Sequence, residues 1–143
     1  MKYALLIYGS DDEWESRSDE ERAAIYKEYF ALSEEPGVFG GAELQPAAVA
    51  TTVRQRDNET LTTDGPFAET KEVLGGLYLL EAANLDDAIA FAARIPNARH
   101  GAVEVRPMMT MTLTVDHRAV DGAAGADFLR TVKQFVEDPA LAL

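Results

Sequence analysis

The chain has 143 residues, with 13 Lys and Arg against 25 Asp and Glu, and a formal net charge of −12. This acidic balance argues against binding to nucleic acid, where basic side chains neutralise phosphates, and against docking on an anionic membrane. No apolar run approaches the roughly 20 residues of a membrane span, and the absence of Cys excludes disulfides and thiolate metal sites. We therefore expect an acidic globular protein of the cytoplasm with one main domain.

The first part of the chain predicts a strand and a helix. The apolar run Lys2–Tyr8 stops at Gly9 and has the length of a buried strand. Ser18 and Glu21 have the spacing of a capping box, in which two side chains satisfy backbone N–H groups at the start of a helix. The helix ends at Pro36-Gly37. Its apolar stripe consists of Ile25, Tyr26, Tyr29 and Phe30.

A second strand and a polar hairpin follow. The segment Val38–Leu44 predicts the strand. The segments Thr51–Arg54 and Thr60–Thr63 flank a polar tip at Asp57-Asn58, which is typical of a β-hairpin. A tight turn is then expected at Asp64-Gly65-Pro66.

The next part of the chain repeats the order strand, helix, strand. The segment Val73–Glu81 predicts a strand in which Gly75-Gly76 marks a bulge or a close backbone approach. Asn84 caps a helix that Pro96 stops, and Ala102–Val105 predicts the last strand. The apolar stripe of this helix consists of Ala88, Ile89, Ala92 and Ile95.

The order of these elements predicts an α+β fold. It is β-α-β, a hairpin insert and β-α-β, which is the ferredoxin-like arrangement of an antiparallel sheet with two helices on one face. The other face stays uncovered unless something packs on it, and a chain of this size commonly covers it with the sheet of a second copy. We therefore expect a homodimer or a higher homo-oligomer, built as a dimeric α+β barrel.

Residues 108–143 predict a C-terminal extension made of a strand, a loop and a helix. Thr alternates with apolar residues in Met109–Val115, which is the period of a half-buried strand. The helix carries apolar residues at three- and four-residue spacing, namely Phe128, Leu129, Val132, Phe135 and Val136. We therefore divide the chain into a domain at 1–107 and an extension at 108–143.

Six segments of residues 1–107 resemble the DGPF-motif branch of the YCII-related family. They are MKYALLIYG, GGAEL, ATTVR, TDGPFAETKE, LGGLYLLE and GAVEVRP. The resemblance implies a dimeric ferredoxin-like α+β barrel with a pocket between the sheets. It implies little about chemistry, since some YCII-related proteins act on chlorinated aromatic compounds and others carry a His–Asp pair in the pocket.

Residues 105–143 are similar to the C-terminal end of a dihydrolipoamide acyltransferase catalytic domain. Asp116-His117-Arg118 and Asp121-Gly122 match the DHRxxDG signature of that family, and Asp138-Pro139-Ala140-Leu141 resembles its usual ending. The resemblance implies that His117 is the general base that takes the proton from a coenzyme A or dihydrolipoyl thiol. Both families carry VRPM near residue 105, so we interpret the chain as a chimera, engineered or natural, joined at this shared sequence.

Three residues are candidates for catalysis, and each has a structural alternative. Asp64 is either an acid or base at the mouth of the pocket or a turn residue, with Phe67 anchoring the turn in the core. His100 is either a pocket base, paired with Asp64 or Glu43, or an exposed loop residue. His117 is either the general base of acyl transfer or part of a motif transplanted without the rest of its site.

These observations predict the kind of ligand only in outline. Two His residues are too few for a multi-His metal centre and no phosphate-cradling loop is present, so we predict neither a metal nor a cofactor. We expect a YCII-related protein with a small-molecule pocket in a dimeric barrel. The alternative is an enzyme, with a lyase-like pocket or an acyltransferase remnant at His117. The aromatic residues that line either the core or the pocket are Tyr3, Tyr8, Trp14, Phe39, Phe67 and Tyr78.

Overall fold

The computed structural model describes residues 1–109 and 122–137. They form two compact units, Met1–Met108 and Met109–Leu143, and each unit is described by itself. No helix within the described residues is long and apolar enough to cross a membrane. The elements are β1 (Lys2–Gly9), α1 (Asp11–Glu15), α2 (Asp19–Ser33), β2 (Val38–Glu43), η1 (Ala47–Val49), β3 (Thr51–Arg56), β4 (Glu59–Asp64), β5 (Val73–Glu81), α3 (Leu85–Ala92), η2 (Pro96–Arg99), β6 (Ala102–Pro107) and α4 (Gly122–Glu137).

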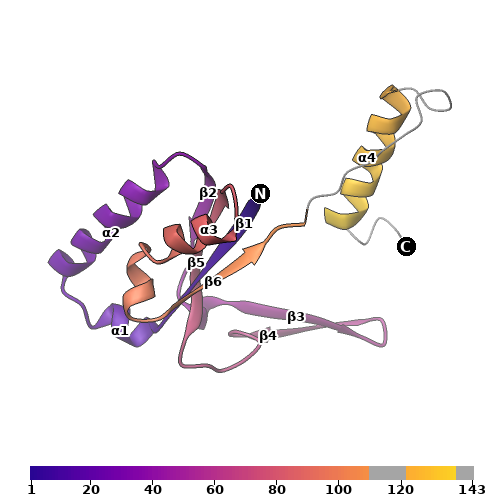
Figure 1. Ribbon diagram of the computed structural model, residues 1–143. Coiled ribbons are helices and arrows are strands. Elements are labelled where there is room, and N and C mark those ends of the chain that lie inside the picture. The colour runs from indigo at the N-terminus through magenta and orange to yellow at the C-terminus, as the bar shows by residue number, and fades with distance from the viewer. Residues whose placement is uncertain (110–121, 138–143) are drawn as a thin grey trace. The chain divides into compact units, whose positions relative to one another are not determined.

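The first unit contains a four-stranded antiparallel sheet with the order β2-β5-β1-β6 (Figure 1). This is the strand order of a ferredoxin-like fold, and the predicted α+β class is confirmed. In the central pair, Ile7 faces Gly76 and Tyr8 faces Leu74, so Gly75 is an extra residue on β5. The bulge predicted at the two glycines is therefore present.

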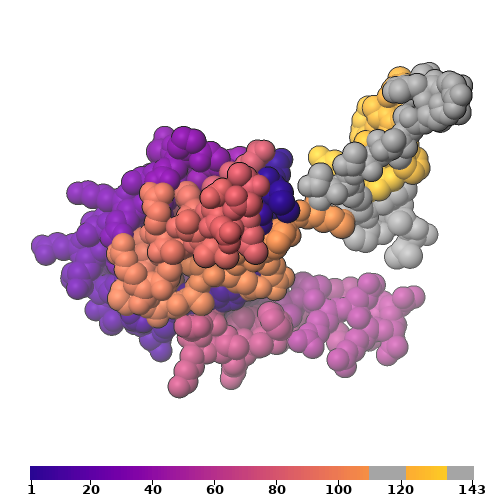
Figure 2. All heavy atoms as spheres, viewed as in Figure 1, coloured from indigo at the N-terminus to yellow at the C-terminus, as the bar shows by residue number. Residues whose placement is uncertain are grey.

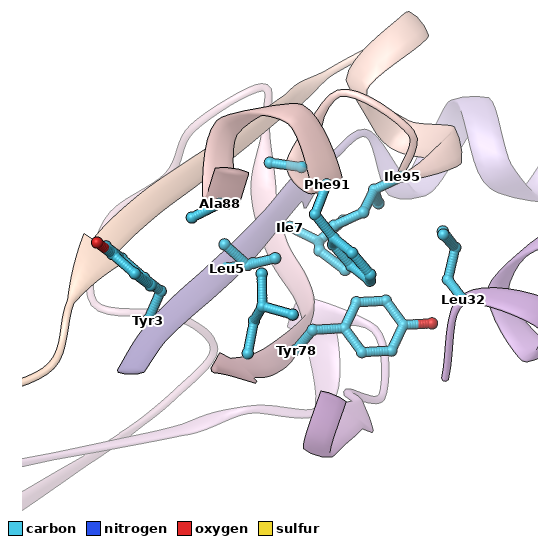
Figure 3. Packing of buried hydrophobic residues seen from close by; sticks show 10 residues of the cluster. Tyr3, Leu5, Ile7, Leu32, Tyr78, Ala88, Phe91 and Ile95 are labelled. Carbon is cyan, nitrogen blue, oxygen red and sulfur yellow. The ribbon is translucent and has the colours of Figure 1, made fainter. Parts of the chain in front are cut away.

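The core lies on one face of the sheet, between the strands and the helices α2 and α3. Alternate residues of β1, namely Tyr3, Leu5 and Ile7, point into it and are buried. Tyr78 from β5 packs with its ring near Phe91 of α3, and its hydroxyl points toward α2 (Figure 3). The other core residues are Leu32, Leu80, Ala88, Ala92 and Ile95. The opposite face carries the intervening residues of the same strands, so neither α2 nor α3 covers it.

Side-chain caps define where both helices of this layer begin. The Ser18 hydroxyl accepts the Glu21 N–H at 3.2 Å, and the Glu21 carboxylate accepts the Ser18 N–H at 2.8 Å, so the predicted capping box is confirmed. The second of these bonds holds the pKa of Glu21 below its ordinary value. Asn84 caps α3 in the same manner, by accepting the Asp87 N–H at 2.9 Å.

The residues of the two helices that contact the core differ in part from the predicted apolar stripes. On α2, Tyr29 packs against the core and Leu32 is buried, whereas Phe30 is 70% exposed. On α3, Phe91 is buried while Ile89 is exposed. Periodicity alone did not separate these positions, because one apolar stripe spans more than the strip that contacts the sheet.

Strands β3 and β4 form a separate two-stranded sheet, the predicted hairpin insert. Asp57 and Asn58 at its tip both have positive φ, which suits a two-residue turn of the primed type. Figure 2 shows the atoms of this hairpin extending away from the body that contains the four-stranded sheet. Nearly all its residues are exposed.

The DGPF turn follows the hairpin and differs from the prediction. Its backbone is held by a hydrogen bond from the Gly65 N–H to the Ala50 carbonyl at 2.7 Å and by the Thr52 hydroxyl donating to the Gly65 carbonyl at 2.8 Å. The Asp64 carboxylate forms no hydrogen bond or ion pair with the described residues, so its side chain does not hold the turn in the way that the turn-residue alternative expected. Phe67 is 79% exposed, because the segment leaves the sheet, and it does not anchor the turn in the core.

In the second unit, α4 confirms the predicted helix of the extension. Phe128 is exposed on this helix, while Leu129 and Val132 are half-buried. The strand predicted at Met109–Val115 lies almost entirely outside the described residues.

The geometry of the turn predicts that substitutions at Gly65 and Asp64 change the free energy of unfolding by different amounts. Gly65 has φ +92°, and no atom lies within 4 Å of an added Cβ, so Gly65→Ala adds backbone strain alone. We expect Gly65→Ala to lower the free energy of unfolding by about 1–3 kcal/mol. Asp64→Ala should change it by less than about 0.5 kcal/mol, the usual range for an exposed residue without a partner. Urea unfolding of both variants measures the difference in the free energy of unfolding. Equal losses of stability in the two variants would show that the Asp64 side chain stabilises the turn.

Candidate functional site

A cavity of about 930 Å³ opens in the first unit among α1, α2, β2 and β5. We call it the α1–α2 cavity. Its walls combine exposed or half-buried aromatic rings with carboxylates, and the loop after η2 closes one side. The residues that line it include Trp14, Arg17, Tyr26, Phe30, Glu43 and His100. Pockets for small molecules in proteins usually measure about 300–1,000 Å³, so this volume is in the range of a ligand site.

Two aromatic rings and a carboxylate form one wall of the cavity. The Trp14 and Tyr26 rings meet edge to face, with centroids 5.4 Å apart and an angle of 85° between their planes. The Tyr26 hydroxyl donates a hydrogen bond of 2.8 Å to the Glu43 carboxylate. This bond raises the pKa of Tyr26, because ionisation of the phenol would place a second negative charge beside Glu43.

A local helix cap and a long-range hydrogen bond bring Trp14 to this wall. The Ser10 hydroxyl accepts the Glu13 N–H at 3.3 Å and begins α1, a five-residue helix that the sequence analysis did not predict. The Asp11 carboxylate accepts the Ala47 N–H at 3.0 Å and so fastens the start of α1 to the segment after β2. An N-capping Ser10 was the available signal for α1.

A second wall contains the basic groups of the cavity. The Arg17 guanidinium pairs with the Glu13 carboxylate at 3.0 Å and lies 5.8 Å from the centroid of the Trp14 ring. His100 follows η2, with its Nδ1 at 3.9 Å from the same Glu13 carboxylate. At that distance the two side chains attract each other only when the imidazole is protonated, and no direct hydrogen bond is formed.

The inner wall belongs to the core. The Tyr78 hydroxyl donates to the Tyr29 carbonyl at 2.8 Å, and the two rings stack with centroids 6.3 Å apart. Burial raises the pKa of Tyr29 to about 12 and also raises that of Tyr78, so both phenols stay neutral at physiological pH. Gly41 lies against this wall, where an added Cβ would meet the Tyr78 ring at 2.9 Å. A glycine is therefore required for β2 to run so close to Tyr78.

The structure separates two of the three candidate catalytic residues, His100 and Asp64. His100 lines the cavity, beside Glu13 and not beside a carboxylate at position 64. Asp64 ends β4 on the hairpin and is not among the residues that line the cavity. His117 lies outside the described residues. Among the described residues no group of three or more His, Asp or Glu side chains could hold a metal ion.

Most of the cavity's polar chemistry was missed by sequence reasoning. Glu43 was considered only as a partner of His100, whereas it accepts the Tyr26 hydroxyl from α2. Tyr26 was assigned to the apolar stripe of its helix, and its polar end gave no separate signal. Of the aromatic residues predicted for the core or the pocket, Trp14, Phe39 and Tyr78 line the cavity.

Comparison with known proteins relates the C-terminal part of the chain to acyltransferases. The profile of the 2-oxoacid dehydrogenase acyltransferase catalytic domain matches residues 86–143. A probable dihydrolipoyllysine-residue succinyltransferase of Schizosaccharomyces pombe is 40% identical over 72 residues, which is 48% of this chain and 16% of that protein. The human dihydrolipoyllysine-residue succinyltransferase is 54% identical over 48 residues, or 34% of this chain and 11% of the enzyme. The similarity thus covers a small part of each enzyme.

The larger part of the chain matches a different family. The profile of the YCII-related domain matches residues 1–112, which include every strand of the first unit and the whole α1–α2 cavity. An uncharacterized protein of Rhizobium meliloti is 40% identical over 114 residues, covering 76% of this chain and 92% of that protein. The two profile matches overlap between residues 86 and 112. The YCII-related match spans more than half of the chain, and the Rhizobium meliloti relative is covered over 92% of its length, so this chain belongs to the YCII-related family.

Proposed function

We propose that the first unit binds a small molecule with an aromatic or apolar body in the α1–α2 cavity. The observation that carries the proposal is the cavity itself, which has the volume of a ligand site and walls of exposed aromatic rings. Polar groups at Glu43, Tyr26 and His100 converge on the same space, and such groups orient a ligand whose body is held by apolar contacts.

A reaction on the bound molecule is a second candidate. It is favoured by His100 and Glu13, whose side chains approach to 3.9 Å at the cavity wall. An imidazole beside a carboxylate suits proton transfer near neutral pH. Turnover of a bound molecule that is lost in His100→Ala, with binding retained, would establish an enzyme.

The chain offers a built-in reporter for the binding test. Trp14 is the single Trp of the sequence and lies in the cavity wall, so its fluorescence reports on an occupied cavity. We expect aromatic compounds to change this fluorescence with saturation. Phe30→Ala should weaken binding by about 2- to 10-fold, the scale of one aromatic contact.

Phe67→Ala is the matched control for this test. Phe30 and Phe67 are both highly exposed, so neither substitution disturbs the core, but only Phe30 lines the cavity. The control should bind the same compounds with unchanged affinity. Equal effects of the two substitutions, or no saturable fluorescence change with any compound, would contradict the proposed site.

We also propose that two copies associate through the sheet face opposite α2 and α3. That face carries Ala4, Leu6 and Leu79, which alternate with the core residues along β1 and β5. A row of apolar side chains on a face that neither helix covers favours packing against an identical face. The pairing would complete the dimeric α+β barrel, with an interface of at least the standard size, about 1,200–2,000 Å² in total.

A charge placed on this face tests the association. We expect the unaltered protein to sediment as a dimer at micromolar concentration and Leu6→Arg to sediment as a monomer, because a buried unpaired guanidinium is costly at an interface. Leu85→Arg on α3 is the control, since Leu85 is exposed on the helical side. A monomeric parent protein, or a dimeric Leu6→Arg variant, would contradict the proposed interface.

We propose that residues 108–143 are an acyltransferase-like extension without catalytic activity, joined to a YCII-type domain at 1–107 as in a chimera. The aligned segment is only 16% and 11% of the two acyltransferases described above. Acyl transfer needs bound coenzyme A, an aligned thiol and an oxyanion stabiliser in addition to the base that His117 would supply. A single general base contributes only about 10²- to 10⁴-fold to a rate.

An acetyl-transfer assay checks this part of the proposal. With acetyl-coenzyme A and dihydrolipoamide as substrates, the protein and its His117→Ala variant should both show only the background rate. Transfer above background that His117→Ala abolishes would show the extension to be catalytic. The same assay on an intact dihydrolipoyllysine-residue acyltransferase serves as the positive control.

A further inference from the structure

We propose that the α1–α2 cavity selects an organic cation, a molecule in which an ammonium group is attached to an aromatic or apolar body. The inference rests on the proposed function, that the cavity binds a small molecule, and assigns the chemical class of its ligand. It depends on three observations: the charges of the cavity walls, the orientation of the Trp14 and Tyr26 rings, and the contact of the Arg17 guanidinium with the Trp14 ring.

The walls of the cavity carry an excess of negative charge. Four carboxylates line it, those of Asp11, Glu13, Glu34 and Glu43, against the single guanidinium of Arg17. Arg17 pairs with Glu13. In the part of the chain that the structure describes, none of the other three carboxylates forms an ion pair. A concave surface lined by one sign of charge attracts ligands of the opposite sign.

The aromatic wall suits a cation independently of these charges. The Trp14 and Tyr26 rings stand nearly perpendicular, at 85°, so that a group beside them meets the face of one ring and the edge of the other. The face of an aromatic ring attracts a cation, and Trp gives the strongest attraction. The Tyr26 hydroxyl is bonded to Glu43, which places a negative charge at the end of the same ring system.

Arg17 shows that this wall accepts a cation. Its guanidinium lies 5.8 Å from the centroid of the Trp14 ring and pairs with a carboxylate of the cavity. Tyr26 and Glu43 form a second pairing of an aromatic ring with a carboxylate, joined through the phenol hydroxyl, and no cation of the described residues pairs with that carboxylate. A ligand ammonium group would complete the second pairing.

Three probes that share a phenyl ring separate the effect of charge from that of the apolar body. Phenyltrimethylammonium, its neutral isostere tert-butylbenzene and the anion benzoate are titrated against the full chain, with Trp14 fluorescence and calorimetry as readouts. We expect phenyltrimethylammonium to bind about tenfold or more tightly than tert-butylbenzene at low ionic strength, benzoate to bind weakest, and added salt to reduce the difference.

Variants of two charged residues locate the effect. Glu43→Gln should lower the affinity for phenyltrimethylammonium by about tenfold and leave that for tert-butylbenzene unchanged. Arg17→Gln should raise the affinity for the cation, because it removes a competing positive charge from the Trp14 ring. Glu59→Gln is the matched control, since Glu59 is an exposed carboxylate on β4 outside the cavity.

The outcomes separate this inference from the proposed function. If tert-butylbenzene binds in the cavity but the cation binds no more tightly, or if Glu43→Gln has the same small effect as Glu59→Gln, the preference for a cation is wrong and the ligand site remains. If none of the three probes changes the fluorescence or releases heat, both the ligand site and its preference are wrong.

Discussion

The packing of Tyr78 holds the first unit together, and the cavity depends on it. Its ring contacts Phe91 of α3 and stacks on Tyr29 of α2, while its hydroxyl bonds to the Tyr29 carbonyl, so a single side chain of β5 joins both helices to the sheet. Gly41 lets β2 run beside the same ring. One side of the Tyr78 ring therefore belongs to the core. Tyr78 itself, with Tyr29 and Gly41, also lines the inner wall of the α1–α2 cavity.

The cavity places polar groups at an edge of this core without burying a charge. Among the described residues, no buried side-chain nitrogen or oxygen lacks a hydrogen-bond partner. Glu43 and Tyr26 remain accessible, and the short helix α1 brings Trp14 to them. Charges in such a partly exposed position cost little to maintain but act strongly on a ligand that displaces the water around them.

Two family profiles match the chain, and their matches overlap at residues 86–112, a segment that includes β6. The first unit ends just after this strand, at Met108. Here β6 pairs with β1 and completes the four-stranded sheet, while the β6 residues Val103 and Val105 pack against the core. One strand sequence is thus compatible with both family patterns, because an alternation of apolar and polar residues suits the edge of many sheets.

The sequence by itself determined the elements whose causes are local. The caps at Ser18 with Glu21 and at Asn84, and the short apolar runs of β1 and β5, act over a few residues. The helix starts, the strands and the α+β order were therefore predictable. Only the tertiary structure decided which polar groups meet. Tyr26 reaches Glu43 across 17 residues, and His100 meets Glu13 from the other end of the unit. Such pairings depend on how β2 and η2 are placed against α1 and α2, which side-chain periodicity does not encode.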